Sequence, residues 1–131
     1  MAGRTILIAD DEPHLVHILA YNLTRAGAVV EIATNGQECV EIALRIRPDL
    51  IVSDYQMPVL DGLQASIQLR SNLATTHIPI LMLTSRGHRL TPAELALTNI
   101  RAVMAKPFSI RQLLKTIEDI LSKPCTGAAA A

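Results

Sequence analysis

The sequence predicts a doubly wound α/β domain, with five parallel strands in one sheet and helices on both of its faces. Short apolar, β-branched runs alternate five times with longer amphipathic stretches, which is typical of βαβ units around a parallel sheet. The chain has 131 residues, which suits one domain of ordinary size. It contains one Phe, two Tyr and no Trp, so its core must consist mainly of aliphatic side chains. Together these observations predict a three-layer α/β/α architecture.

The first two units are a strand and a helix each. Residues 5–9 are a continuous apolar run, as expected for a strand covered on both faces. Pro13 can occupy the first turn of the following helix, and Gly27 can end that helix in a left-handed conformation. Residues 29–33 form a weaker strand, and Asn35 then begins the second helix.

The other three strands and three helices continue this alternation. They are predicted at residues 50–53, about 63–70, 78–83, 90–97, 101–105 and 110–121. The last helix has a clear apolar stripe with a period of 3.6 residues, whereas the fourth is marked only by Leu90, Ala93 and Leu97. We expect one domain over residues 4–122, and residues 123–131 to be a disordered tail, a linker or an expression remnant.

The composition excludes several classes of function. Twelve basic and twelve acidic residues cancel, so the chain offers no net field for nucleic acid or an anionic membrane. Cys39 and Cys125 have no spacing typical of a disulfide framework or a metal site, which favours free thiols in a reducing compartment. No apolar stretch approaches the roughly 20 residues that span a bilayer. A soluble, cytoplasmic protein is therefore expected.

The reactive side chains stand just after predicted strands. Asp10 and Asp11 follow the first strand, Asp54 the third, Thr84 the fourth and Lys106 the fifth. In open α/β sheets, ligands bind outside the carboxyl ends of the strands. With the flavodoxin-like strand order 2-1-3-4-5, those four strands are consecutive neighbours. We therefore expect these side chains to meet at one edge of the sheet, with the second strand outermost.

Three converging carboxylates would repel one another, and one would tend to protonate without a counter-charge. A divalent cation resolves the repulsion, and Mg²⁺ takes oxygen ligands, usually one or two carboxylates together with a phosphate oxygen. Asp11 and Asp54 are the best direct ligands, with Asp10 beside them and the backbone carbonyl of Gln56 as a further candidate. Mg²⁺ is therefore the predicted cofactor, with Mn²⁺ as an alternative.

Simpler interpretations exist for each residue alone. Asp10 and Asp11 could cap a helix, Asp54 could be a solvated residue at a strand end, and Thr84 and Lys106 could be an ordinary helix cap and a surface lysine. Their joint placement argues against these interpretations. The four histidines, His14, His17, His77 and His88, share no spacing of metal ligands and are expected at the surface.

The same residues lie within longer motifs. These are Ile-Leu-Ile-Ala-Asp-Asp-Glu at 6–12, Pro-Asp-Leu-Ile-Val-Ser-Asp-Tyr-Gln-Met-Pro at 48–58, Leu-Thr-Ser at 83–85 and Lys-Pro-Phe at 106–108. In this order and spacing, which cover about positions 4–122, the chain closely resembles the receiver family of bacterial two-component response regulators.

The resemblance implies that Asp54 accepts a phosphoryl group from a sensor histidine kinase or a histidine phosphotransfer protein. It also implies that Asp10 and Asp11 organise Mg²⁺, that Lys106 pairs with a phosphoryl oxygen and that Thr84 binds another. Phosphoryl transfer depends on positioning and charge neutralisation, which gives each role a physical reason. The expected function is a phosphorylation-dependent signalling switch that catalyses only its own phosphorylation and slow self-dephosphorylation.

Some positions depart from the family pattern. Val103 stands three residues before the lysine, where the family commonly has an aromatic residue that turns inward on phosphorylation. We expect the output to be relayed instead by the Thr84 loop and the fourth helix, within residues 84–100. Gln56 and Arg86 stand at positions that flank the approach of water to the acceptor in this family, so the resemblance does not predict the lifetime of the phosphorylated state.

Two other functions agree less well with these residues. A phosphatase or mutase of the haloacid-dehalogenase type places its nucleophile on strand one with a second Asp two residues on, whereas here Asp10 is followed by Glu12 and no cap insertion is present. A pseudo-receiver tends to lose the acidic pair, the acceptor or the lysine, and all are kept. The partner kinase and the output module are not predicted, and dimerisation through the fourth helix, fifth strand and fifth helix is an expectation from the family.

Overall fold

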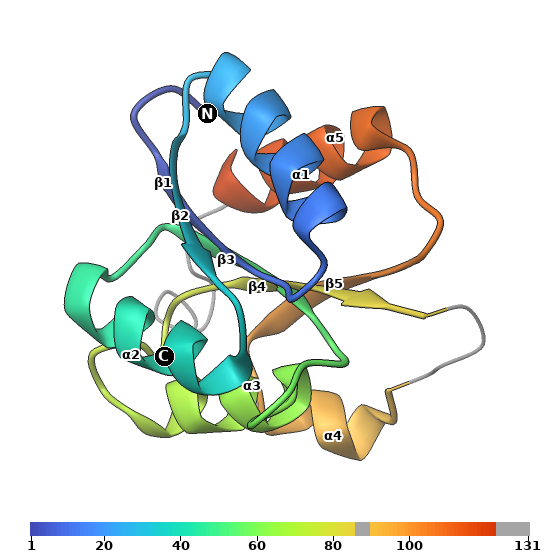
Figure 1. Cartoon of the computed structure of the whole chain (residues 1–131). Coiled ribbons are helices and arrows are strands. Elements are labelled where there is room, and N and C mark those ends of the chain that lie inside the picture. Colours follow the sequence, from blue (N-terminus) through green and yellow to red (C-terminus); the bar gives the residue numbers. More distant parts are fainter. Residues whose placement is uncertain (86–89, 123–131) are drawn as a thin grey trace.

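The structure, a computed structural model, describes residues 1–85 and 90–122 (Figure 1). Its sheet has five parallel strands in the order β2-β1-β3-β4-β5, as predicted. The strands are β1 (Thr5–Ala9), β2 (Val29–Ala33), β3 (Leu50–Asp54), β4 (Ile80–Thr84) and β5 (Ile100–Ala105). The doubly wound α/β fold is confirmed.

Five helices cover the two faces of the sheet. They are α1 (Pro13–Arg25), α2 (Gly36–Ile46), α3 (Gly62–Ser71), α4 (Pro92–Ala96) and α5 (Ile110–Ser122). Helices α1 and α5 lie on one face, and α2, α3 and α4 lie on the other (Figure 1). Each face has its own apolar core: Leu19, Leu23, Leu113 and Ile117 pack on one side, and Cys39, Ala43, Ala65 and Leu69 on the other. The two cores give the three layers that the sequence predicts.

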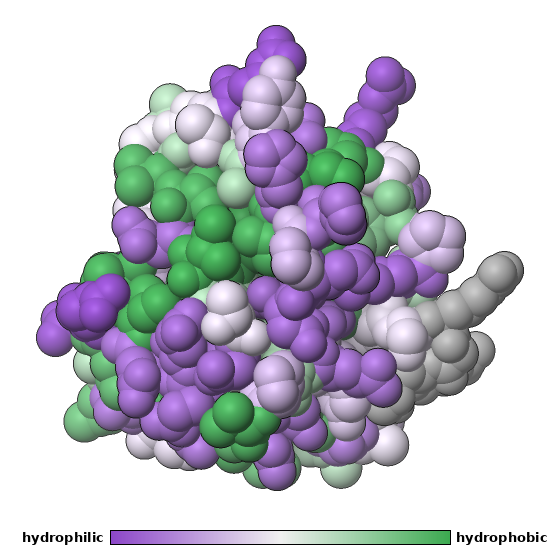
Figure 2. Space-filling model, viewed as in Figure 1, coloured by the Kyte–Doolittle hydropathy of each residue, from purple (hydrophilic) through white to green (hydrophobic). Residues whose placement is uncertain are grey.

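The burial of the strands explains their sequence patterns. Every residue of β3 and β4 is buried, because both strands are central and covered on both faces. The edge strand β2 is largely exposed, which accounts for its weaker apolar pattern. Figure 2 shows hydrophobic side chains at the surface near β2 and α1, where Ile18, Val29 and Ile32 are exposed.

Local signals set the helix boundaries. Pro13 is at the start of α1, and Gly27 follows its C-cap with φ of 100°. The side chain of Asn35 caps α2 by accepting a hydrogen bond from the backbone N–H of Glu38 at 2.8 Å. These predicted ends are confirmed.

Two predicted elements differ from the structure. Strand β4 begins at Ile80 rather than at residue 78, since the N–H of Ile78 donates to the carbonyl of Thr75 in a turn and Pro79 has no N–H for a ladder. Helix α4 is only five residues long. It is defined by a capping box of Thr91 and Glu94, with Pro92 at its start, rather than by an apolar stripe.

The apolar residues that predict α4 do not form a buried face, so this part of the prediction is wrong. Ala93 is exposed and Leu97 is 57% exposed, and only Leu90, which precedes the helix, packs against the core. The position of this helix is therefore set by its capping box and not by a buried apolar face.

Other predictions concern the cysteines and the ends of the chain. Cys39 is buried in α2 as a free thiol, and burial raises its pKa to about 12. Arg86, His88, Cys125 and the predicted tail at 123–131 lie outside the described residues. Within the described part of the chain, no helix has the length and apolarity needed to cross a membrane.

Candidate functional site

The strand ends bring three carboxylates together. Strands β1 and β3 are paired with Ala9 opposite Ser53, so the residues that follow these two positions, Asp10 and Asp54, are neighbours. One carboxylate oxygen from each of Asp10, Asp11 and Asp54 lies within 4.8 Å of the others. Two unit charges at that separation repel by about 3 kcal/mol at an effective dielectric constant of 20. The cluster therefore needs a counter-charge.

Lys106 supplies a counter-charge from the far side of the site. It follows β5, and its Nζ lies 3.2 Å from Oδ1 of Asp54 and 3.7 Å from Oδ2 of Asp10. The backbone N–H of Lys106 donates to the carbonyl of Thr84 at 2.8 Å, which fixes the start of the β5–α5 loop to the end of β4. A long lysine side chain thus reaches across β4 to the carboxylates, as predicted from the strand spacing.

Burial sets the electrostatics of the site. Asp10 is 1% exposed and Asp54 is 7% exposed. Burial raises the pKa of Asp54, and it also raises the pKa of Asp10, to which the nearby charge of Asp54 contributes. Burial would lower the pKa of Lys106, but the charges of Asp10 and Asp54 outweigh it and raise that pKa. The lysine is therefore held as a cation beside two carboxylates that are costly to ionise.

The carboxylate of Asp10 shows that the site suits a cation. Its Oδ1 accepts a hydrogen bond from the N–H of Glu12 at 2.9 Å, whereas its buried Oδ2 has no hydrogen-bond partner among the described residues and only lies 3.7 Å from Nζ of Lys106. A buried carboxylate oxygen that lacks a hydrogen bond is costly unless a positive charge compensates it. The all-oxygen donor set of the three carboxylates fits a hard divalent cation such as Mg²⁺.

Two glycines allow the loop after Asp54 to pack closely. A Cβ at Gly62 would overlap the backbone oxygen of Asp54, and a Cβ at Gly36 would overlap the backbone oxygen of Leu60. The N–H of Gly62 also donates to the carbonyl of Tyr55 at 2.8 Å. The N-terminus of α3 therefore packs directly against the strand end that carries Asp54.

The structure places the predicted residues as follows. Asp10, Asp11, Asp54 and Lys106 meet at one edge, and Thr84 is buried at the adjoining end of β4, next to Ala105 in the ladder. Their catalytic and ligand roles, including that of the Gln56 carbonyl, stay predictions. The close packing of Gly62 against the backbone of Asp54 has no signal in the sequence, because it depends on the position of α3.

The simpler interpretations fare less well. Asp54 is not a solvated strand-end residue, because it is buried. The N-cap of α1 is Glu12, whose side chain makes no capping hydrogen bond. His14, His17 and His77 are exposed, as predicted.

A scan of known families identifies the domain. The model of the response regulator receiver domain matches residues 6–118. The chain belongs to this family. Receiver domains are signalling domains of two-component systems.

Curated relatives agree with this assignment. The receiver domain is 37% identical over 121 residues to the alkaline phosphatase synthesis transcriptional regulatory protein PhoP of Bacillus subtilis, covering 92% of this chain and 50% of that protein. It is 32% identical to the phosphate regulon transcriptional regulatory protein PhoB of Pseudomonas aeruginosa, covering 97% of this chain and 56% of that protein. The chain thus spans about half the length of these relatives.

Solved structures share the fold. The chemotaxis response regulator CheY4 of Vibrio cholerae superposes with a TM-score of 0.81 at 32% identity, covering 92% of this chain and 98% of that one. The receiver domain of the sensor histidine kinase PA1611 of Pseudomonas aeruginosa superposes with a TM-score of 0.83 at 27% identity, covering 93% of this chain and 100% of that one. That structure has a magnesium ion coordinated in its active site cleft.

Proposed function

We propose that this receiver domain is a phospho-acceptor switch in which Asp54 takes a phosphoryl group from a histidine kinase or a histidine phosphotransfer protein. The observation that carries the proposal is the contact of Lys106 with Asp54 at 3.2 Å, inside a cluster of three carboxylates at the carboxyl edge of the sheet. A buried acceptor beside a fixed cation suits a reaction in which negative charge is brought to a negative group.

In the proposed reaction, a carboxylate oxygen of Asp54 attacks the phosphorus of a phosphohistidine. The O–P bond forms as the P–N bond breaks, and the electron pair of that bond stays on the imidazole nitrogen of the donor. Lys106 pairs with a phosphoryl oxygen, and the hydroxyl of Thr84 binds another after the transfer. Burial of Asp54 limits the access of water to the acyl phosphate.

Asp10, Asp11 and Asp54, with the backbone carbonyl of Gln56, are the residues we propose to hold Mg²⁺. The all-oxygen donor set supports this assignment, as does the Oδ2 of Asp10, which is buried and accepts no hydrogen bond within the described residues. Bound Mg²⁺ would neutralise charge on the phosphoryl group. Asp10 contributes mainly by orienting the cluster, because its Oδ1 is already engaged by the N–H of Glu12.

The test of the proposal is incubation with Mg²⁺ and acetyl phosphate, followed by measurement of the intact mass. We expect the gain of one phosphoryl group, which disappears in Asp54→Asn and when Mg²⁺ is removed with EDTA. Asp49→Asn, which changes a carboxylate at the opposite edge of the sheet, is the matched control and should still be phosphorylated. No gain with acetyl phosphate or with a phosphorylated histidine donor would refute the proposal.

Lys106 is proposed to couple phosphorylation to the output. Lys106→Ala should leave Mg²⁺ binding nearly intact, because the proposed ligands remain, while phosphorylation no longer changes the conformation of the domain. Titration with Mg²⁺ and amide exchange before and after phosphorylation measure the two effects separately. An unaltered exchange response in Lys106→Ala would contradict this role.

The output surface is proposed to include α4 and β5. Val103 is aliphatic and 42% exposed on β5, so no aromatic ring is available at this position to turn inward. With Leu97 it places two exposed apolar side chains on the α4–β5–α5 side, which supports a proposed homodimer there. Amide exchange of residues 90–105 with and without a phosphoryl mimic tests the relay, and sedimentation velocity of the two forms tests the dimer.

A further inference from the structure

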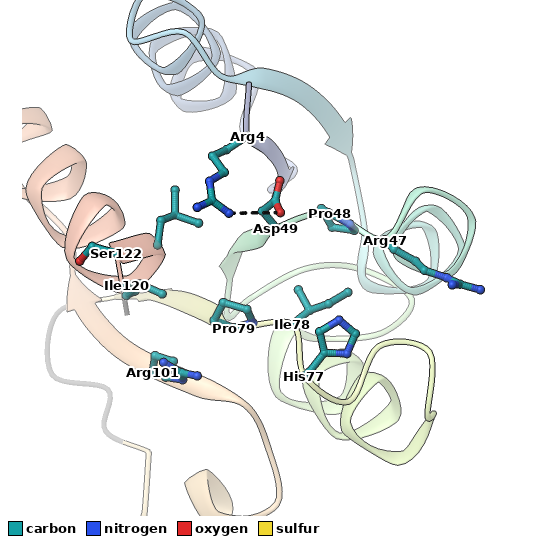
Figure 3. Close-up of a pocket in the computed structure, with 11 residues that line it drawn as sticks. Arg4, Arg47, Pro48, Asp49, His77, Ile78, Pro79, Arg101, Ile120 and Ser122 are labelled. Atoms are coloured by element: carbon teal, nitrogen blue, oxygen red, sulfur yellow. Dashed lines mark ion pairs between the residues drawn. The ribbon is translucent and has the colours of Figure 1, made fainter. Parts of the chain in front are cut away.

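A second charged pocket lies at the opposite edge of the sheet, where the strands begin (Figure 3). Its volume is about 490 Å³, within the range of small-molecule sites. Residues that precede or begin β1, β3, β4 and β5 line it, together with the last turn of α5. Nothing in the proposed phosphorylation chemistry uses this edge.

The pocket has an excess of positive charge. Three arginines, Arg4, Arg47 and Arg101, line it with a single carboxylate, that of Asp49. This carboxylate is already engaged, because its Oδ2 accepts the N–H of Thr5 at 2.8 Å and its Oδ1 lies 3.6 Å from Arg4. Within residues 1–85 and 90–122, neither Arg47 nor Arg101 has an ion-pair partner. Two guanidinium groups are therefore available to an anion, in a chain whose net charge is zero.

Two separate irregularities of the backbone place these arginines at the pocket. Arg47 is the C-cap of α2 with φ of 48°, a left-handed conformation usually taken by Gly or Asn. Arg101 is an extra residue in β5, because the ladder pairs Ile80 with Ile100 and then Leu81 with Ala102. A bulge of this kind redirects a side chain, and such strained positions gather at ligand sites. The coincidence of both irregularities at one pocket points to a binding function.

The shape of the pocket favours a small phosphorylated ligand. A guanidinium group matches the oxygens of a phosphate with two parallel hydrogen bonds. Ile78, Pro79 and Ile120 provide an apolar wall for an organic group, and the lining contains no Phe, Tyr or Trp. Figure 3 shows Arg4 directed at Asp49 and Arg47 extended outward, away from the other lining residues, so the side chain of Arg47 must turn inward to contact an anion in the pocket.

We propose that this pocket binds a small phosphomonoester, with its phosphate held by Arg101 and Arg47 and its organic part against Ile78 and Ile120. The site is independent of the acceptor at Asp54, since the two lie at opposite edges of one sheet.

The test uses backbone amide chemical shifts of the metal-free protein, titrated with inorganic phosphate, glycerol 3-phosphate and glucose 6-phosphate. Glycerol and glucose serve as the uncharged counterparts. We expect saturable shifts at His77, Ile78 and Ser122, tighter binding of an ester than of inorganic phosphate, and no shifts at Asp10 or Asp54. An absence of saturable shifts up to about 10 mM ester would overturn the proposal.

Two variants test the arginines. Arg101→Gln and Arg47→Gly should each weaken ester binding by about tenfold, and Arg47→Gly also removes the left-handed strain, so loss of binding cannot be ascribed to unfolding. Arg111→Gln on α5 lowers the net charge equally at a distance and should bind like the parent. An equal loss of ester affinity in Arg111→Gln would mean that binding depends on the net charge of the protein and not on this pocket. Tighter binding of a glutamate-rich peptide than of either ester would indicate a peptide site. Either outcome would overturn the proposal.

Discussion

The two edges of the sheet carry opposite charges in opposite environments. At the carboxyl edge, three carboxylates surround one lysine, and two of them are buried. At the amino edge, three arginines surround one aspartate, and the side chains of that ion pair are largely exposed. Both edges concentrate charge of one sign, but only the carboxyl edge removes it from water.

The two edges are destabilised by different physical effects. At the carboxyl edge the cost is electrostatic, because burial and mutual repulsion disfavour the ionised carboxylates. At the amino edge the charges are solvated, and the unfavourable contribution to stability is backbone strain, at Arg47 and at the bulge that contains Arg101. Substitutions at the two edges should therefore affect stability through different causes and by different amounts.

The largest effect is expected from packing at the carboxyl edge. Gly62→Ala places a methyl group against the backbone of Asp54 and within 3.0 Å of Sδ of Met82, and should destabilise the domain by about 3 kcal/mol. Gly3→Ala, near the amino edge, meets no atom within 4 Å and should cost only about 1 kcal/mol through its φ of 77°. Urea denaturation measures both values. Equal losses would mean that the close approach at Gly62 is not needed for stability.

The second effect concerns charge at the carboxyl edge. The pKa of Asp10 is raised in the folded state, so the folded protein binds this proton more readily than the unfolded chain. Protonated Asp10 therefore contributes to the stability of the folded state below the ordinary pKa of 3.8. This contribution is lost as the pH rises through the raised pKa of Asp10 in the folded state. Asp10→Asn, which keeps an acceptor for the N–H of Glu12, should therefore stabilise the metal-free protein at neutral pH by roughly 1–2 kcal/mol.

Denaturation in EDTA at a series of pH values measures this effect. The parent should lose stability above pH 3.8 more steeply than Asp10→Asn does. Asp119→Asn removes an exposed carboxylate on α5 and is the matched control, with little expected change. If Asp10→Asn were less stable than the parent at neutral pH, the electrostatic cost assigned to this edge would be wrong.

The third effect tests the backbone cost at the amino edge. Arg47→Gly should stabilise the domain by about 0.5–1 kcal/mol, because glycine adopts the left-handed conformation without a steric penalty. Thermal unfolding monitored by circular dichroism provides the measurement. Arg45→Gly, in the last turn of α2, should instead destabilise by about 1 kcal/mol, since glycine disfavours a helix interior. Destabilisation by both variants would contradict the proposed strain.

The smallest effect is expected at the ion pair of the amino edge. Arg4→Gln should change the free energy of unfolding by less than about 0.5 kcal/mol, because the pair with Asp49 is exposed and 3.6 Å apart. Asp49→Ala should cost about 1 kcal/mol, since it also removes the acceptor of the N–H of Thr5. Chemical denaturation of the two variants separates the contributions. A larger loss in Arg4→Gln than in Asp49→Ala would reverse this ranking.

Much of the fold could be predicted because its signals are local. The apolar run of β1 and the capping residue Asn35 each act within a few residues of chain. Helix α4 was predicted poorly because its apolar residues are not buried, and a stripe of three residues cannot reveal whether a face is covered. The start of β4 was misplaced for a similar reason, since Ile78 is apolar and buried but lies in a turn.

The meeting of Asp10, Asp11, Asp54 and Lys106 follows from the order of residues along the chain, because parallel strands align their carboxyl ends at one edge. How deeply Asp10 and Asp54 are buried, and which oxygen lacks a hydrogen-bond partner among the described residues, depends on the packing of the folded chain, since every element around a group contributes to its desolvation. The tertiary structure also decided that Arg47 and Arg101 share a pocket, because a bulge exists only relative to the partner strand. The order of residues along a strand is given by the sequence of that segment. Its register and burial depend on the strands and helices that pack against it.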